Sequence, residues 1–151
     1  MKLVNKDIWE SKDSVIAVTT NSFIKKSGDL VMGRGAAYEA MQRFPWLPKI
    51  AGDQILKHYK HLGVYHWMVL GPMGNAQDRS IGLFQVKYHF RDAASLQLIK
   101  ESVDKLNEWV RISDRTVSLN FPGIGNGGLS IDTVLPVVSN LDERVTVYKW
   151  P

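Results

Sequence analysis

Two glycine-rich segments carry the pattern in this sequence that best suits anion binding. PGIGNGG at 122–128 holds four glycines in seven positions, and MGRG at 32–35 precedes a helix-forming stretch. Glycine allows positive φ and lets a ligand approach the backbone amides directly. Amides at the start of a helix carry partial positive charge, which stabilises an anion. Two such loops at one end of a sheet could hold a pyrophosphate between them.

Neither segment matches a known phosphate-binding motif on its own. The pattern GxxxxGK[ST] is absent, which argues against an NTPase phosphate loop. GIGNGG fits GxGxxG only if Asn126 and Gly127 take the free positions, and it comes too late in the chain to open a dinucleotide unit. A glycine loop before a helix is also often only a tight turn, so that alternative stays open for each loop.

Lys87 is the candidate for covalent or acid–base chemistry. It follows the apolar run SIGLFQV at 80–86, with His89 and Arg91 close by in sequence. A lysine attacks a sugar carbon only as the neutral amine, and burial or neighbouring cations favour that form. The alternative is that Lys87 marks a solvated strand end.

Short β-prone runs alternate with helical patterns along the chain. The runs lie at 14–19, 66–71, 80–86, 116–121 and 144–150, with a weaker candidate at 3–9. Helices are predicted at 35–44, 49–62 and 95–110, the first two separated by PWLP and the third capped by Ser95. A last helix follows the second glycine segment, and Pro136 predicts that it begins near Asp132 or Thr133.

This alternation predicts an α/β fold with a central sheet covered by helices on both faces. In such sheets, ligands bind beyond the carboxyl ends of the strands. The loops that follow strands, including both glycine segments and the segment after 86, are therefore where chemistry is expected.

Composition narrows the class of protein. A length of 151 residues suits one domain over 1–151, and 19 basic against 15 acidic residues give a modest net charge of +4. The absence of cysteine excludes disulfides, thiolate zinc sites and a cysteine nucleophile. His58, His61 and His66 lack metal-ligand spacing, so no metal site is expected. No apolar run reaches about 18 residues, and the N-terminus lacks a signal-peptide h-region. We expect a cytoplasmic monomer that does not contact a membrane.

Five stretches together resemble a macrodomain, the ADP-ribose-binding fold. They are VNKDIWES, VTTNSF, GDLVMGRGAAYEAMQRFP, LNFPGIGNGGLSIDTVLPVV and FQVKYHFRDAASLQLIKESVDKL. The last stretch is the most discriminating. It is similar to the segment PTKxHWR…S…I…L of the branch that includes terminal ADP-ribose glycohydrolases and antitoxins that remove ADP-ribose from thymidine in DNA.

The resemblance implies a three-layer α/β/α sandwich with a mixed, roughly six-stranded sheet and ADP-ribose across its crest. It implies no required cofactor or metal. The ligand is ADP-ribose or an ADP-ribosylated molecule, with modified nucleic acid among the substrates. By resemblance, Lys87 and Asn21 are catalytic, and the ligand-binding positions are Asp7, Ile8, Asn21, Met32, Gly33, Arg34, Gly35, Pro122, Gly123, Ile124, Gly125, Asn126, Gly127, Gly128 and Leu129.

Individual roles keep a structural alternative. Asp7 would accept the adenine amino group, but it equally suits a capping position. Asn21 would orient the distal ribose, and asparagine is also a common turn residue. The lysine-dependent glycohydrolases place an aspartate where this chain has Gly127. This chain therefore lacks, at that position, one of the two residues of the complete lysine–aspartate mechanism. Ala36 and Ala37 also stand where a bulkier apolar residue is usual.

Three functions are considered for this sequence besides nucleic-acid binding as the main role, which the modest net charge favours least. The first is hydrolysis of an ADP-ribosyl linkage with Lys87 as nucleophile or base. The second is a phosphatase acting on ADP-ribose 1″-phosphate, for which Asp29, Asp132 or His89 would have to serve. The third is a non-catalytic module that binds ADP-ribose or a related nucleotide.

Overall fold

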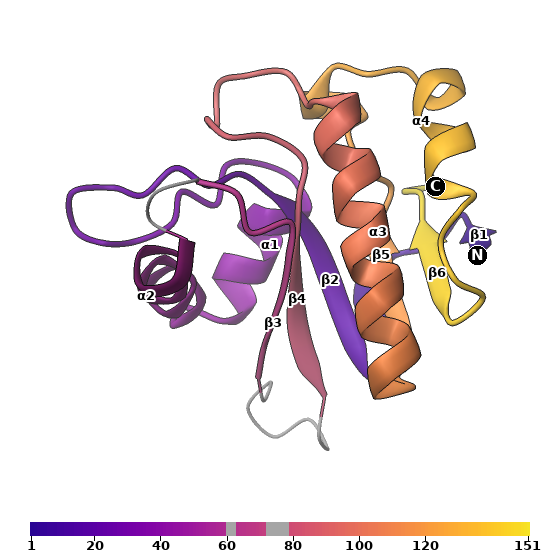
Figure 1. Cartoon of the computed structure of the whole chain (residues 1–151), viewed down its shortest axis with the longest axis horizontal. Helices are drawn as coiled ribbons and strands as arrows, with labels where there is room; N and C mark the ends of the chain where they lie inside the picture. The colour runs from indigo at the N-terminus through magenta and orange to yellow at the C-terminus, as the bar shows by residue number, and fades with distance from the viewer. Residues whose placement is uncertain (60–62, 72–78) are drawn as a thin grey trace.

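The computed structural model describes residues 1–59, 63–71 and 79–151. Within these residues six strands form one sheet in the order β1-β6-β5-β2-β4-β3 (Figure 1). Only the β3–β4 pair is antiparallel, so the sheet is mixed, as the resemblance implied. The strands are β1 (Lys2–Val4), β2 (Val15–Thr20), β3 (Trp67–Leu70), β4 (Ser80–Gln85), β5 (Val117–Asn120) and β6 (Val145–Tyr148).

Helices cover both faces of the sheet, which confirms the predicted three layers. Figure 1 shows α1 and α2 on one side and α3 and α4 on the other. None of the helices in the described residues is long and apolar enough to cross a membrane. The helices are α1 (Ala36–Arg43), α2 (Leu47–Tyr59), α3 (Leu96–Ser113) and α4 (Ile131–Val138), with 3-10 turns η1 (Ile8–Glu10) and η2 (Gly125–Gly127).

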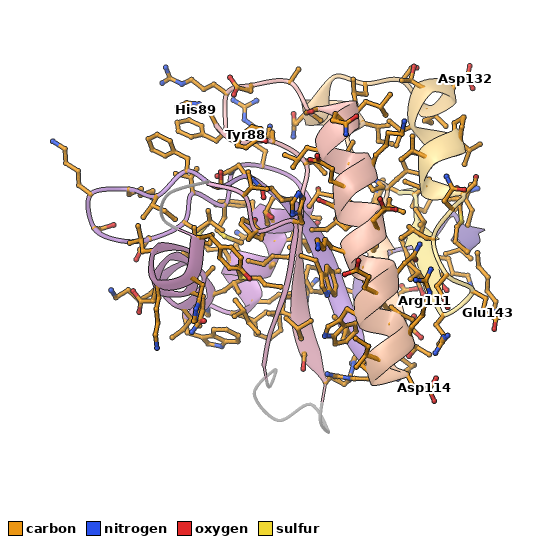
Figure 2. The ribbon with its side chains drawn as sticks, in the orientation of Figure 1. Tyr88, His89, Arg111, Asp114, Asp132 and Glu143 are labelled. Atoms are coloured by element: carbon orange, nitrogen blue, oxygen red, sulfur yellow. The ribbon has the colours of Figure 1, made fainter. Side chains whose placement is uncertain are left out.

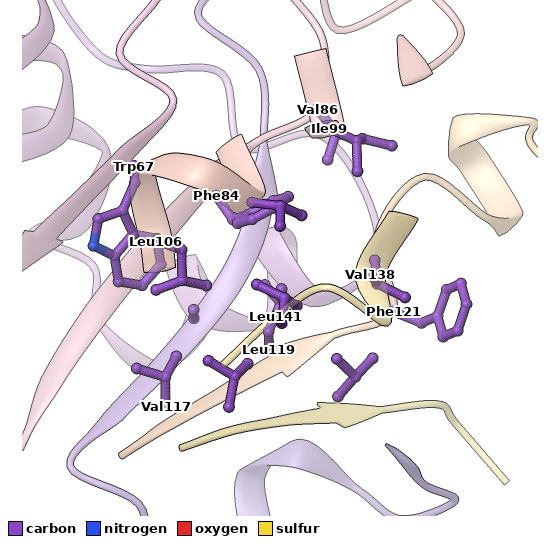
Figure 3. Packing of buried hydrophobic residues seen from close by; sticks show 14 of the residues in the cluster. Trp67, Phe84, Val86, Ile99, Leu106, Val117, Leu119, Phe121, Val138 and Leu141 are labelled. Carbon is purple, nitrogen blue, oxygen red and sulfur yellow. The ribbon is translucent and has the colours of Figure 1, made fainter. Parts of the chain in front are cut away.

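The central strand β2 divides the apolar core into two layers. Val15 and Ala17 pack in the cluster under α3 and α4, whereas Ile16 and Val18 pack in the cluster under α1 and α2. Figure 3 shows residues of the first cluster. Successive side chains of a strand point to opposite faces, so a strand covered on both sides must be apolar throughout. Burying each such side chain contributes about 1.5–3 kcal/mol.

The parallel strands end at one edge of the sheet. Thr20 at the end of β2 pairs with Gln85 at the end of β4, and Asn120 at the end of β5 pairs with Tyr148 at the end of β6. Because these strands run in the same direction, the segments that leave them begin side by side. The two glycine segments and the lysine segment therefore begin at the same edge, as the alternation predicted.

The long helix α3 begins where its sequence predicted. The Ser95 hydroxyl accepts a hydrogen bond from Leu98 N at 3.2 Å, which confirms the predicted N-cap. The helix ends at Asp114, which adopts a left-handed conformation with φ of 55°. The N-terminal end of α3 thus lies next to the lysine segment, which immediately precedes it.

Three predicted boundaries were wrong. The last helix begins at Ile131, not at 132 or 133, because Ser130 caps it and Pro136 is tolerated inside it. Pro136 and Asp132 are both exposed, so water can bond the carbonyl that loses its helical donor. Helix α2 begins within PWLP, since Pro48 occupies the first turn, where no amide donor is needed. The candidate strand at 3–9 ends at Val4 and gives way to η1.

Candidate functional site

Three loops leave the carboxyl edge of the sheet. The first loop (residues 21–35) joins β2 to α1, and the second loop (residues 121–130) joins β5 to α4. The lysine loop (residues 86–95) joins β4 to α3. These three loops, with the segments that flank β1 and β6, form the walls of the site.

Two adjoining cavities lie among these loops and form one groove. Their volumes are about 620 Å³ and about 470 Å³. The larger contains Lys87 and is called the Lys87 end, and the smaller contains Trp150 and is called the Trp150 end. Both cavities share the same wall midway along the groove, made by Gly35, Ala36, Asn120, Ile124 and Asn126. The two glycine-rich loops therefore meet at the middle of the groove.

Bare backbone faces the groove where the loops meet. A Cβ on Gly35 would lie 3.9 Å from the Asn126 side-chain nitrogen, so the two loops are in reach of one another. Gly33 and Gly125 have φ of 65° and 62°, and a Cβ on either would meet nothing within 4 Å. Helix α1 begins directly after Gly35 and has no side-chain cap. Its first amides are therefore free to bond an anion in the groove.

The first loop is held by the side chain of its own first residue and by Tyr65, which precedes β3. The buried Asn21 side chain donates to Val31 O at 2.8 Å and accepts from Phe23 N at 2.8 Å. The Tyr65 hydroxyl donates to Asn21 O at 2.7 Å and also bonds the Thr20 hydroxyl. Burial raises the pKa of Tyr65, which keeps the phenol neutral and able to donate. The start of the loop and its backbone at Val31 are thus fixed before any ligand binds.

A glycine in α2 allows the first loop to pack closely against that helix. A Cβ on Gly52 would lie 1.9 Å from Gly28 O, so the backbone of the loop rests directly on the helix. Close by, Leu30 N donates to Pro48 O at 3.0 Å. The position of the first loop therefore depends on the absence of a side chain at 52.

The second loop is held by its own backbone. Gly128 N donates to Gly125 O at 3.0 Å and Leu129 N donates to Gly123 O at 2.9 Å. The lysine loop joins it through Ala94 N, which donates to Gly127 O at 2.8 Å. A Cβ on Gly127 would lie 3.1 Å from the Ala94 Cβ, so the second loop and the lysine loop touch at Gly127. This is the position at which the lysine-dependent glycohydrolases have an aspartate.

Lys87 lies on the rim of the larger cavity. Its Nζ donates to Phe90 O and to Asp92 O, each at 3.2 Å. The lysine loop thus curls around its own side chain. A neutral amine has two N–H groups, so it can keep both contacts while its lone pair stays available for a reacting carbon.

A buried glutamine positions the backbone of Lys87. The fully buried Gln85 side chain donates to Lys87 O at 3.2 Å and to Gly63 O at 3.0 Å. Its oxygen accepts from Tyr65 N at 2.9 Å and from His66 N at 3.1 Å. Four bonds satisfy the whole amide, so the end of β4 is tied to the segment before β3.

The Trp150 end of the groove has a different chemistry. Ile8, Phe121, Tyr148 and Trp150 line it with apolar and aromatic surface. Such a wall suits a flat heterocyclic ring. Charged residues also line this end, namely Lys6, Glu39 and Lys149.

The structure gathers most of the site residues named from the sequence along one groove. Twelve of them line it: Ile8, Asn21, Met32, Gly33, Arg34, Gly35, Lys87, Gly123, Ile124, Gly125, Asn126 and Gly127. Four others do not line it and lie beside it in the chain: Asp7, Pro122, Gly128 and Leu129. The Asp7 carboxylate caps η1 by accepting from Trp9 N at 3.0 Å, which was its structural alternative. Its role toward a ligand stays a prediction.

Sequence reasoning missed several groove residues. Asn120 and Tyr148 are the last residues of β5 and β6, so the rule that ligands bind beyond strand ends could have pointed to them. The others gave no such signal, because their types are common on any surface: Thr19, Thr20, Lys6, Glu39, Val86, Phe90, Arg91, Asp92, Phe121, Lys149 and Trp150.

The residues that a phosphatase would need lie off the groove. Asp29, Asp132 and His89 line neither cavity. Figure 2 places Asp132 over α4 and His89 beyond the opposite side of α3. The His89 ring nitrogen Nδ1 accepts from Arg91 N at 3.0 Å, so it is used within its own loop. Among the described residues, no group of three or more side chains could hold a metal ion, and His61 lies outside those residues.

Comparison with known proteins identifies the fold. No family model and no curated sequence matches the chain. The macrodomain of Thermus aquaticus DarG matches with a TM-score of 0.70 at 24% identity, over 99% of this chain and 97% of that one. The macrodomain of Mycobacterium tuberculosis DarG matches with a TM-score of 0.77 at 22% identity, over 99% of this chain and 97% of that one. Thermosipho africanus DarTG in complex with ADP-ribose matches with a TM-score of 0.78 at 21% identity, over 97% of this chain and 40% of that one. The chain has the macrodomain fold.

Proposed function

We propose that this protein binds ADP-ribose along the groove and hydrolyses an ADP-ribosyl linkage at the Lys87 end. The proposal rests on the order in which three kinds of chemical group follow one another along the groove. An aromatic end, a middle of bare amides and an end with a lysine follow one another. ADP-ribose presents an adenine, a diphosphate and a ribose in the same order. The fold shared with Thermosipho africanus DarTG, whose structure is a complex with ADP-ribose, supports the same ligand.

Adenine would occupy the Trp150 end. Ile8 and Phe121 offer it an apolar slot, and Trp150, of which 66% is exposed, can close over a ring. The Asp7 carboxylate has one oxygen bonded to Trp9 N and no hydrogen bond from a described residue to the other. A free carboxylate oxygen accepts from the adenine amino group and repels the carbonyl of guanine.

The diphosphate would sit where the two glycine-rich loops meet. The first amides of α1 and the backbone at Gly33 and Gly125 surround that position from both sides. Arg34, which is exposed and lines the same cavity, adds a cation. Preorganised amides of this kind hold an anion without the reorganisation that water would need.

The distal ribose would then lie beside Lys87 and Asn21. In the proposed reaction Lys87 attacks C1″ as a nucleophile, or acts as a base toward the attacking water. The bond from C1″ to the carrier breaks, its electron pair goes to the carrier atom, and water leaves its oxygen on C1″ of free ADP-ribose. Asn21 holds the first loop in place and would orient the ribose hydroxyls, and such orientation contributes several kcal/mol to catalysis.

A cluster of aromatic and basic residues beside the Lys87 end favours a nucleic acid as the carrier. The Phe23 ring contacts the His89 ring edge-on at 4.7 Å, and the His89 ring stacks on Phe90 at 4.4 Å. The Arg91 guanidinium lies over Phe90 at 5.5 Å. Exposed aromatic rings next to cations can stack bases of a single strand and attract its phosphates. We call this cluster the aromatic rim: Phe23, Lys25, Lys26, Tyr88, His89, Phe90 and Arg91.

The test measures release of ADP-ribose from modified single-stranded DNA and from modified protein. We expect wild type to release it, faster from DNA, and Lys87→Ala to lower kcat by about 100-fold or more. The dissociation constant for ADP-ribose, measured by calorimetry with ATP and NAD as controls, should change little. Lys100→Ala removes an exposed lysine from α3 and serves as the matched control.

Other results would redirect the proposal. Equal rates for wild type and Lys87→Ala would remove Lys87 from the mechanism. Tight binding of ADP-ribose without turnover of either substrate would leave a non-catalytic module. Absence of ADP-ribose binding would overturn the proposal altogether.

A further inference from the structure

Hydrolysis at C1″ needs a group that takes a proton from the attacking water. Among the described residues that line the Lys87 end, Asp92 is the one with a carboxylate. The other acidic residue of the groove, Glu39, lines the Trp150 end. A base must be within reach of the reacting carbon, so the position of Asp92 makes it the candidate.

The lysine loop holds Asp92 close to Lys87 by its backbone. Lys87 Nζ donates to Asp92 O at 3.2 Å, and Asp92 N donates to His89 O at 3.0 Å. Both bonds use main-chain atoms of Asp92. One short loop therefore holds the lysine amine against the main chain of Asp92.

The carboxylate of Asp92 is not used by the fold. It makes no hydrogen bond or ion pair with residues 1–59, 63–71 or 79–151, although Lys87 and Arg91 are its neighbours. Within the same residues Asp29, Asp104 and Asp132 also lack such partners, whereas Asp53 pairs with Lys49 at 3.2 Å, so Asp92 differs from them in lining the cavity. An exposed carboxylate without a partner, on the wall of a cavity, is free to act on a ligand.

The second loop cannot supply the carboxylate instead. Its nearest position, Gly127, has no side chain, and a Cβ there would lie 3.1 Å from the Ala94 Cβ. The residues that the second loop contributes to this cavity are uncharged: Gly123, Ile124, Asn126 and Gly127. A base at this end therefore has to come from the lysine loop itself.

We infer that Asp92, and not Lys87, is the general base of this site and activates the water that releases ADP-ribose, which leaves Lys87 the role of nucleophile. In that step the water oxygen bonds C1″ while the bond from C1″ to its leaving atom breaks. The water proton goes to the Asp92 carboxylate, and the electron pair of the broken bond goes to the leaving atom. Asp92 then returns the proton to the leaving atom, so one water is consumed and the enzyme is unchanged. The inference rests on the proposed hydrolysis.

The test uses Asp92→Asn, which keeps the shape and removes the proton acceptor. Because the side chain has no partner in the fold, the variant should fold as wild type does. We expect kcat for ADP-ribose release to fall by about 100-fold or more, with the dissociation constant for ADP-ribose within about twofold of wild type. Asp104→Asn, an exposed aspartate of α3, is the matched control and should retain full activity.

Sodium azide separates a base from a structural residue. The azide anion attacks carbon without losing a proton, so it should restore cleavage in Asp92→Asn and yield ADP-ribosyl azide, detected by mass spectrometry. Azide should not restore Lys87→Ala to the same extent. A role in folding or in loop position would not respond to azide.

Each other outcome overturns the inference in a distinct way. Wild-type rates in Asp92→Asn would remove Asp92 and leave the proposed hydrolysis standing. A slow variant that azide does not rescue would also remove it as the base. A wild-type protein that binds ADP-ribose but cleaves neither substrate would overturn the hydrolysis, and the role of Asp92 with it.

Discussion

The first and second loops reach the same groove by different means. Besides its backbone bonds, the first depends on one side chain, that of Asn21, and on the close approach of Gly28 to Gly52 in α2. The second is held by backbone bonds alone, between its own residues and from Ala94 N of the lysine loop. Both expose bare amides to the groove, so two structural solutions serve one requirement.

This difference predicts which substitutions should disturb each loop. Substitutions far from the groove should disturb the first loop, since its support comes from α2 and from the end of β2. The second loop should respond mainly to changes of its own glycines, whose positive φ values permit its turns. Three substitutions test this contrast.

The largest effect is expected from Gly52→Ala. Alanine in the interior of an exposed helix normally adds about 1 kcal/mol of stability relative to glycine. Here its Cβ would lie 1.9 Å from Gly28 O, so the first loop must move. We expect the free energy of unfolding to fall by about 3 kcal/mol and ADP-ribose affinity to weaken.

Thermal denaturation and calorimetry give the two readouts, with Lys57→Ala on the exposed side of α2 as the control. A stabilised Gly52→Ala variant would show that the first loop does not depend on this contact.

An intermediate effect is expected from Asn21→Ala, because Val31 O and Phe23 N would lose their partner. Leaving these groups unpaired should cost about 2 kcal/mol. The second loop offers a matched asparagine, Asn126, which is exposed and makes no hydrogen bond with the described residues. Asn126→Ala should change stability by less than about 0.5 kcal/mol. Chemical denaturation measures both, and equal losses would contradict the contrast between the loops.

A smaller loss of stability than that of Asn21→Ala is expected from Gly125→Ala. Its φ of 62° costs alanine about 1 kcal/mol, and its Cβ would meet no atom within 4 Å. The loss should therefore come from the backbone alone and be seen as a small shift of the thermal midpoint. A loss as large as that of Gly52→Ala would mean that the second loop also depends on contacts outside itself.

The sequence was most informative where periodicity is strong. The apolar runs predicted β2 and β4, and the spacing of apolar residues with Ser95 predicted α3 and its cap. Boundaries at prolines were harder, because a proline crowds the carbonyl four residues earlier and removes its hydrogen bond, a cost that is smaller where water can bond that carbonyl. In α4 that carbonyl belongs to exposed Asp132, so Pro136 stays inside the helix.

The middle of the groove and Lys87 were also predictable from sequence, whereas most of the aromatic end was not. Glycine clusters indicate a backbone without room for side chains, so the sequence predicted Gly33, Gly35 and Gly125 as groove residues. The aromatic end depends on Tyr148 and Trp150, which reach it only because β6 pairs between β1 and β5. Strand order is set by long-range packing and leaves no local signal. The unpaired state of the Asp92 carboxylate is likewise visible only in three dimensions.

The contact between Gly127 and Ala94 also constrains how this protein can evolve. Gaining an aspartate at 127 would bring its Cβ within 3.1 Å of the Ala94 methyl, so the new side chain would be crowded from the start. A prior change of Ala94 to glycine would clear that space. The effects of substitutions at 127 and 94 should therefore not be additive.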